Sequence, residues 1–83
     1  MKTIFIDGDL YADSHELHEA LKRMLALPDY YGCNADALND CVSSMSETVN
    51  ACIVSTGSGS VASTVELVCR VLEDNGGSVR SIG

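Results

Sequence analysis

The residues best placed to do chemistry are two carboxylates, Asp36 and Asp40, which lie four residues apart. If this segment is helical, the two side chains share a face and repel each other by roughly a few tenths of a kcal/mol. No Lys or Arg occurs between Arg23 and Arg70 to relieve that repulsion. The helix dipole favours Asp36 in a first turn but does not support Asp40 farther along. Two carboxylates that destabilise their own helix indicate that this helix face binds a cationic partner. The alternative is an ordinary solvated helix face.

The residues that precede this pair form a tight bend, Pro28–Gly32, which carries Tyr30 and Tyr31. Pro28 ends any preceding helix, because proline has no backbone N–H to donate. Tyrosine offers a large rigid contact surface and one hydroxyl, which suits an anchor at a protein interface. Two adjacent tyrosines do not easily both point outward, so we expect one of them in the core.

A second candidate for chemistry is the glycine-rich segment Gly57–Ala62, with the sequence GSGSVA. It follows an expected strand and opens an expected helix, which fits the GxGxxG/A pattern that holds a pyrophosphate at a helix N-terminus. The chain has neither the ribose-binding acid nor a second nucleotide-binding half. A turn between strand and helix is the default interpretation. A phosphate- or nucleotide-binding regulatory module that uses Gly57–Ser60 is the alternative function.

The histidines and cysteines do not form a recognisable metal or catalytic motif. His15 and His18 in the sequence HELH do not match the zincin pattern HExxH, so we expect a solvated helix face. The cysteines are separated by 7, 10 and 16 residues and form no CxxC pair, so we expect buried or half-buried thiols without a disulfide framework. The sequence therefore predicts no metal, no cofactor and no enzyme. The four cysteines are Cys33, Cys41, Cys52 and Cys69.

Composition excludes several function classes. A chain of 83 residues allows one domain with a modest core, and 46% hydrophobic residues argue against disorder. A net charge of −7 argues against nucleic acid and anionic membranes as partners, and favours a basic protein. No stretch resembles a membrane span or a secretory signal, so we expect a cytoplasmic protein.

The hydrophobic pattern predicts the elements that position these residues. Helical spacing predicts a first helix of about three turns after Asp13, a short second helix after the N-cap residue Asn34, and a third over 61–74. Met45 and Val49 are candidate anchors in the polar connection between the second helix and the next strand. Apolar runs predict strands over 3–6, 51–55 and 79–82.

The order of these elements is strand, helix, helix, strand, helix, strand. Helical crossovers between strands favour a parallel sheet, because parallel strands need long connections. We therefore expect a single α/β domain over residues 1–83 with a three-stranded parallel sheet.

The segment Leu25–Cys41, LALPDYYGCNADALNDC, and the preceding Glu16–Lys22, ELHEALK, resemble the barstar family of small intracellular ribonuclease inhibitors. Over the second half of the chain only the order of elements agrees. The resemblance implies a two-layer α/β fold in which the sheet packs with about three helices. Family members commonly carry a further short helix after the second strand, for which Thr56–Ser60 is too short.

The resemblance also implies a function and a site. A protein of this family is a monomer when free and binds one basic extracellular ribonuclease of the barnase type. Asp40 matches the carboxylate that replaces an RNA phosphate in the nuclease active site. Two family tryptophans align with Asn39 and Met45, and an outlying glutamate aligns with Val71, so a related nuclease or weaker binding is the alternative to barnase itself. A barstar-like module for another basic protein is a further alternative. The expected partner-binding residues are Tyr30, Gly32, Asn34, Asp36, Asn39, Asp40 and Met45.

Overall fold

The fold was obtained as a computed structural model, which describes residues 2–82 of the chain. The predicted order of elements is confirmed, with one additional 3-10 turn, η1, after the first strand. No extra helix intervenes between the second strand and the last helix in this part of the chain. In order, the elements are β1 (Lys2–Asp7), η1 (Gly8–Leu10), α1 (Ser14–Met24), α2 (Ala35–Ser43), β2 (Val49–Ser55), α3 (Gly59–Asp74) and β3 (Val79–Ser81).

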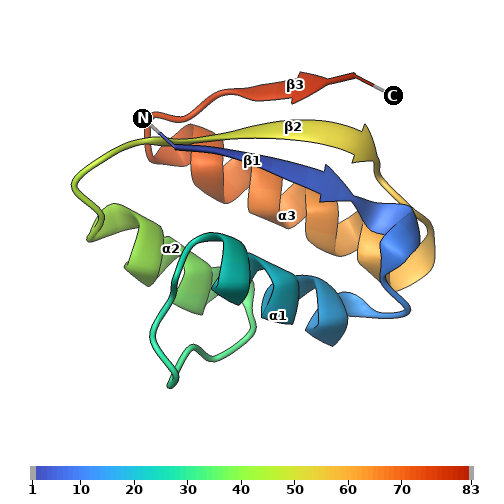
Figure 1. The fold of residues 1–83 in the computed structure, drawn as a ribbon, viewed down its shortest axis with the longest axis horizontal. Helices are drawn as coiled ribbons and strands as arrows, with labels where there is room; N and C mark the ends of the chain where they lie inside the picture. The colour runs from blue at the N-terminus through green and yellow to red at the C-terminus, as the bar shows by residue number, and fades with distance from the viewer. Residues whose placement is uncertain (1, 83) are drawn as a thin grey trace.

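The strands form a parallel sheet in the order β1-β2-β3. Ala51 is central, because it pairs with Ile4 on one side and with Val79 on the other. The helices α1, α2 and α3 lie on one side of the sheet, which makes a two-layer α/β fold (Figure 1). The predicted fold class is therefore confirmed. The second strand begins at Val49, two residues earlier than expected.

The core lies between the sheet and these helices. Side chains alternate along a strand, so Ile4 and Ile6 of β1 are buried whereas Phe5 between them is exposed. The opposite face of the sheet carries Phe5 and, opposite it in register, Cys52. The helix α3 contributes an apolar stripe that is buried throughout and consists of Val61, Val65, Val68 and Leu72.

The helices begin and end at the residues that favour such boundaries. The carboxylate of Asp13 accepts a hydrogen bond from the Glu16 N–H at 2.9 Å and thereby caps α1. After α3, Gly76 adopts a left-handed φ of 86°, and the N–H of Gly77 donates to Leu72 O at 2.8 Å. This is the Schellman arrangement, in which a glycine ends the helix.

The described helices include none that is both long and apolar enough to cross a membrane.

Candidate protein-binding site

The start of α2 is fixed by a single side-chain amide. Asn34 Oδ1 accepts a hydrogen bond from the Ala37 N–H at 2.8 Å, and Asn34 Nδ2 donates to Gly32 O at 3.2 Å. The first bond caps the helix, as the sequence predicts. The second ties the preceding loop to the same residue. Asn34 therefore holds the bend and α2 in one arrangement, and both ends of its amide are occupied by that task.

The two tyrosines of the bend have opposite environments. Tyr30 is 87% exposed, whereas Tyr31 is 7% exposed and belongs to the core. The prediction that one of them is buried is therefore confirmed. The Tyr31 hydroxyl lies 2.7 Å from His18 Nδ1, and the two rings are tilted against each other. This contact anchors the bend to α1 and leaves the ring of Tyr30 available at the surface.

The expectation that His15 and His18 share a solvated helix face is wrong for His18. His15 is exposed, but His18 is only 4% exposed. His18 lies three residues before Leu21 and seven before Leu25, both buried, so it falls on the apolar stripe of α1. Burial lowers the pKa of His18, and His15 lowers it further. Its partner Tyr31 is 13 residues away, so sequence spacing gave no indication of the bond.

The two carboxylates of α2 are exposed and uncompensated. Neither the Asp36 nor the Asp40 carboxylate forms an ion pair or a hydrogen bond with any residue in the range 2–82. The backbone carbonyl of Asp40 does have partners, since it accepts from Ser43 Oγ at 3.1 Å and Ser44 Oγ at 2.9 Å. These bonds hold the end of α2 without neutralising its charge. A face of this kind can attract a cationic group.

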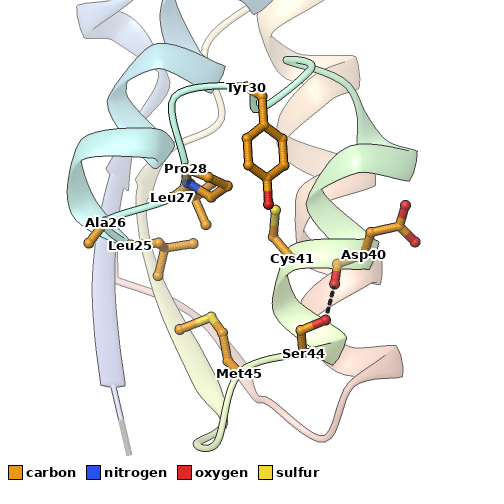
Figure 2. Close-up of a pocket in the computed structure, with 9 residues that line it drawn as sticks. All are labelled: Leu25, Ala26, Leu27, Pro28, Tyr30, Asp40, Cys41, Ser44 and Met45. Atoms are coloured by element: carbon orange, nitrogen blue, oxygen red, sulfur yellow. Dashed lines mark hydrogen bonds between the residues drawn. The ribbon is translucent and has the colours of Figure 1, made fainter.

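A shallow hollow of about 330 Å³ lies between the bend and α2. Figure 2 shows the ring of Tyr30 pointing toward Cys41 across this hollow, while the Asp40 carboxylate points away from it toward solvent. An apolar depression and an exposed charge therefore lie side by side. The lining residues are Leu25, Ala26, Leu27, Pro28, Tyr30, Asp40, Cys41, Ser44 and Met45.

The fold brings together only some of the predicted partner-binding residues. Tyr30, Asp40 and Met45 line the hollow. Asn39 lies elsewhere, because its Oδ1 accepts a hydrogen bond from Asn75 Nδ2 at 2.8 Å, at the end of α3. The other predicted members, Gly32, Asn34 and Asp36, lie in the loop and first turn that lead toward the hollow.

The glycine-rich segment has a packing role. A Cβ on Gly57 would lie 2.8 Å from Gly8 O, and Gly57 has a left-handed φ of +71°. The loops that follow β1 and β2 therefore approach each other closely at these two glycines. Dinucleotides bind in open sheets where the strand order reverses, and the order β1-β2-β3 has no such reversal. The close approach of Gly8 thus explains why residue 57 is a glycine, although the same GxGxxG/A pattern also fits phosphate binding.

One group of ligand-type side chains was missed by sequence reasoning. His15, Glu19 and Cys33 place one ligand atom each within 4.8 Å of one another. The spacing of His15 and Glu19, one helical turn apart, indicates half of this cluster. Cys33 joins it only because the bend folds back against α1. The four cysteines are otherwise half-buried free thiols, as expected.

The fold and this surface define a class: a two-layer α/β protein with an acidic helix beside an exposed aromatic loop. A sequence model described as "Barstar (barnase inhibitor)" matches residues 1–79. The chain therefore belongs to the barstar family, as the resemblance implied.

A relative in Bacillus subtilis (strain 168) bears the name "Putative ribonuclease inhibitor YrdF". It is 50% identical to this chain over 42 residues. The match spans 51% of this chain and 46% of the relative, which is about half of each.

Proposed function

We propose that this protein inhibits a basic, extracellular-type ribonuclease of the barnase kind by covering its active site. The observation that carries the proposal is the exposed, uncompensated pair Asp36 and Asp40 on a helix that Asn34 ties to the bend. Membership of the barstar family and the name of the Bacillus relative support the same function. The protein acts as a cytoplasmic binding partner and not as an enzyme.

The mechanism is electrostatic mimicry of RNA. A ribonuclease active site presents cationic groups to the phosphates of its substrate, and a rigid helix can present carboxylates to the same groups. Asp40 occupies the position of a phosphate, and Asp36 adds to the field that attracts the enzyme. The ring of Tyr30 contributes contact area at little entropic cost, because it has only two side-chain torsions. The hollow beside it receives a side chain of the partner.

The remaining members of the proposed interface have supporting tasks. Gly32 and Asn34 set the path of the loop, and Asn34 also caps α2. Asn39 and Met45 stand where the family resemblance places tryptophans. Met45 lines the hollow, whereas Asn39 lies outside it and belongs to the rim of the interface. Asn39 is held by Asn75, so it presents a polar edge instead of an indole ring.

The direct test is titration of a barnase-type ribonuclease with the purified protein. We expect activity to fall linearly and to reach its minimum at one equivalent. A lack of inhibition across a panel of basic ribonucleases would contradict the proposal. In that case capture of a different basic protein becomes the better account, since Asn39, Met45 and Val71 differ from the family pattern.

A second measurement distinguishes the nucleotide-binding alternative from the proposed ribonuclease inhibition. Addition of ATP or NAD to isotope-labelled protein reports on Gly57–Ser60 through backbone amide shifts. We expect no saturable change there, because the backbone of Gly8 already lies against Gly57. Saturable shifts confined to residues 55–64 would favour the regulatory module instead.

A further inference from the structure

His15, Glu19 and Cys33 form a compact cluster of three different ligand types at the surface between α1 and the bend. His15 Nε2 lies 3.5 Å from Glu19 Oε1, and Cys33 Sγ lies 3.8 Å from the same oxygen. The His15 side chain is 69% exposed and that of Glu19 is 41% exposed, so an ion can reach them from solvent. Neither the family nor the proposed interface accounts for this juxtaposition.

The distances are close to those around a tetrahedral ion. With bonds of about 2.0–2.3 Å to zinc, neighbouring ligand atoms lie roughly 3.4–3.6 Å apart. The separation of 3.5 Å between His15 Nε2 and Glu19 Oε1 lies within this range, and the separation of 3.8 Å between Cys33 Sγ and Glu19 Oε1 is slightly longer. The third separation, between the imidazole and the thiol, lies within 4.8 Å. Rotation of the exposed His15 side chain can close that remaining gap.

Two features of the fold produce the cluster. His15 and Glu19 lie one turn apart on α1, so they share a helix face. Cys33 adopts a left-handed φ of 53° immediately after Gly32, and the turn there brings its thiol against α1. Partial burial and the negative charge of Glu19 raise the pKa of Cys33, whereas Lys22 acts in the opposite direction. A cation that replaces the thiol proton would relieve the repulsion between the Cys33 thiolate and the Glu19 carboxylate.

We propose that His15, Glu19 and Cys33 form a binding site for Zn²⁺. Imidazole nitrogen, carboxylate oxygen and thiolate sulfur bind to the ion, and water takes the fourth position. The Cys33 thiol releases its proton to solvent as the bond between zinc and sulfur forms. A donor set that includes sulfur and imidazole selects against Mg²⁺ and Ca²⁺, which require oxygen ligands. Bound zinc links α1 to the loop that leads into α2.

Co²⁺ serves as the probe, because it takes the same tetrahedral sites as Zn²⁺ and, unlike Zn²⁺, has absorption bands that report its ligands. We expect reduced protein to bind one Co²⁺ with a thiolate-to-cobalt charge-transfer band in the near ultraviolet, and Zn²⁺ to abolish that band. Cys33→Ser should lose the band, and His15→Ala should weaken binding by at least about tenfold. Cys52→Ser is the matched control, since Cys52 lies on the far face of the sheet, and it should keep the full signal.

Thermal melting gives an independent readout of the same site. At a free Zn²⁺ concentration about a hundredfold above its dissociation constant, the melting temperature should rise by roughly 10–20 °C in wild type and Cys52→Ser. Melting of Cys33→Ser without metal checks that this variant is folded. Absence of the cobalt band in wild type, or an equal band in Cys33→Ser, would overturn the proposal. Because neither assay uses a ribonuclease, the outcome is separate from that of the proposed inhibition.

Discussion

Tyr30 and Tyr31 are neighbours in the chain but have different tasks. Tyr31 is buried and bonded to His18, and no buried side-chain nitrogen or oxygen within residues 2–82 lacks a hydrogen-bond partner. Burial, aided by Cys33 and Cys41, raises the pKa of Tyr31, so its hydroxyl keeps its proton. Tyr30 makes no comparable contact and is exposed. Of these two adjacent tyrosines, Tyr31 therefore stabilises the fold, and Tyr30 is the one available for binding.

Tyr31→Phe should destabilise the protein, because it leaves the buried His18 Nδ1 without a partner. The expected loss is about 1–3 kcal/mol of unfolding free energy. Tyr30→Phe removes a hydroxyl at the surface and should change stability by less than about 0.5 kcal/mol. Urea unfolding of both variants makes the comparison, and equal stability of the two would contradict the assigned role of Tyr31.

Gly57→Ala and Gly59→Ala form a second matched pair. Both glycines have a left-handed φ, but a Cβ on Gly59 would meet nothing within 4 Å, whereas one on Gly57 would meet Gly8 O at 2.8 Å. Each alanine should cost roughly 1–2 kcal/mol for its backbone conformation. Gly57→Ala should lose at least about 1 kcal/mol more, since two backbone segments must separate. Equal losses in calorimetric melting would mean that the close approach has no energetic consequence.

The stability and position of α2 depend on the residue that caps its N-terminus. It is a short helix, so propensity alone gives little stability. Its position comes from Leu38 and Val42, which are buried, and from Asn34, which joins it to the bend. The helix α3 begins differently, because its N-cap residue Ser58 makes no side-chain hydrogen bond. The two helix starts therefore provide a comparison within one chain.

Asn34→Ala should reduce unfolding free energy by about 0.5–2 kcal/mol, because the Ala37 N–H loses its acceptor. It should also weaken ribonuclease inhibition, since the loop is no longer tied to α2. Ser58→Ala, which removes no cap bond, should leave both quantities nearly unchanged. Urea unfolding and inhibition assays on the two variants test this, and a Ser58→Ala defect as large as that of Asn34→Ala would refute it.

The helices and strands also show how much of this structure the sequence predicts. The order of elements, the parallel pairing of the strands, and the caps Asp13 and Asn34 follow from local patterns and are confirmed. The burial of His18 and the approach of Cys33 to Glu19 depend on how the bend folds back onto α1. Such contacts join residues 13 and 14 positions apart, and no periodicity along one helix encodes them. Local physics therefore predicts the elements, while tertiary packing decides which side chains meet.

At the scale of the whole molecule, charge sets the kind of partner. The chain carries 12 acidic and 5 basic side chains, for a net charge of −7. Its five cationic residues lie outside the stretch between Arg23 and Arg70, which includes the bend and α2. An acidic molecule with two uncompensated carboxylates on one exposed helix should attract a basic enzyme from a distance.

Salt should therefore weaken the complex mainly by slowing association. Exposed charges are screened over about 10 Å at 0.1 M ionic strength and about 3 Å at 1 M. We expect the association rate constant to fall by at least about tenfold over this range, with a smaller change in dissociation. Stopped-flow mixing with the inhibited ribonuclease measures both rates. An association rate that is independent of salt would indicate an apolar interface.

The measurement that tests the central claim most directly is ribonuclease inhibition by Asp40→Asn beside Asp9→Asn. Both replacements remove one exposed carboxylate, so the change in net charge is identical, but Asp9 lies in η1, outside the proposed interface. The complex of barnase with barstar is itself one of the systems on which general hot-spot magnitudes rest. On that scale Asp40→Asn should weaken inhibition roughly 30-fold or more, about 2 kcal/mol, while Asp9→Asn stays close to wild type. Equal inhibition by two folded variants would contradict the assignment of Asp40 as a phosphate mimic.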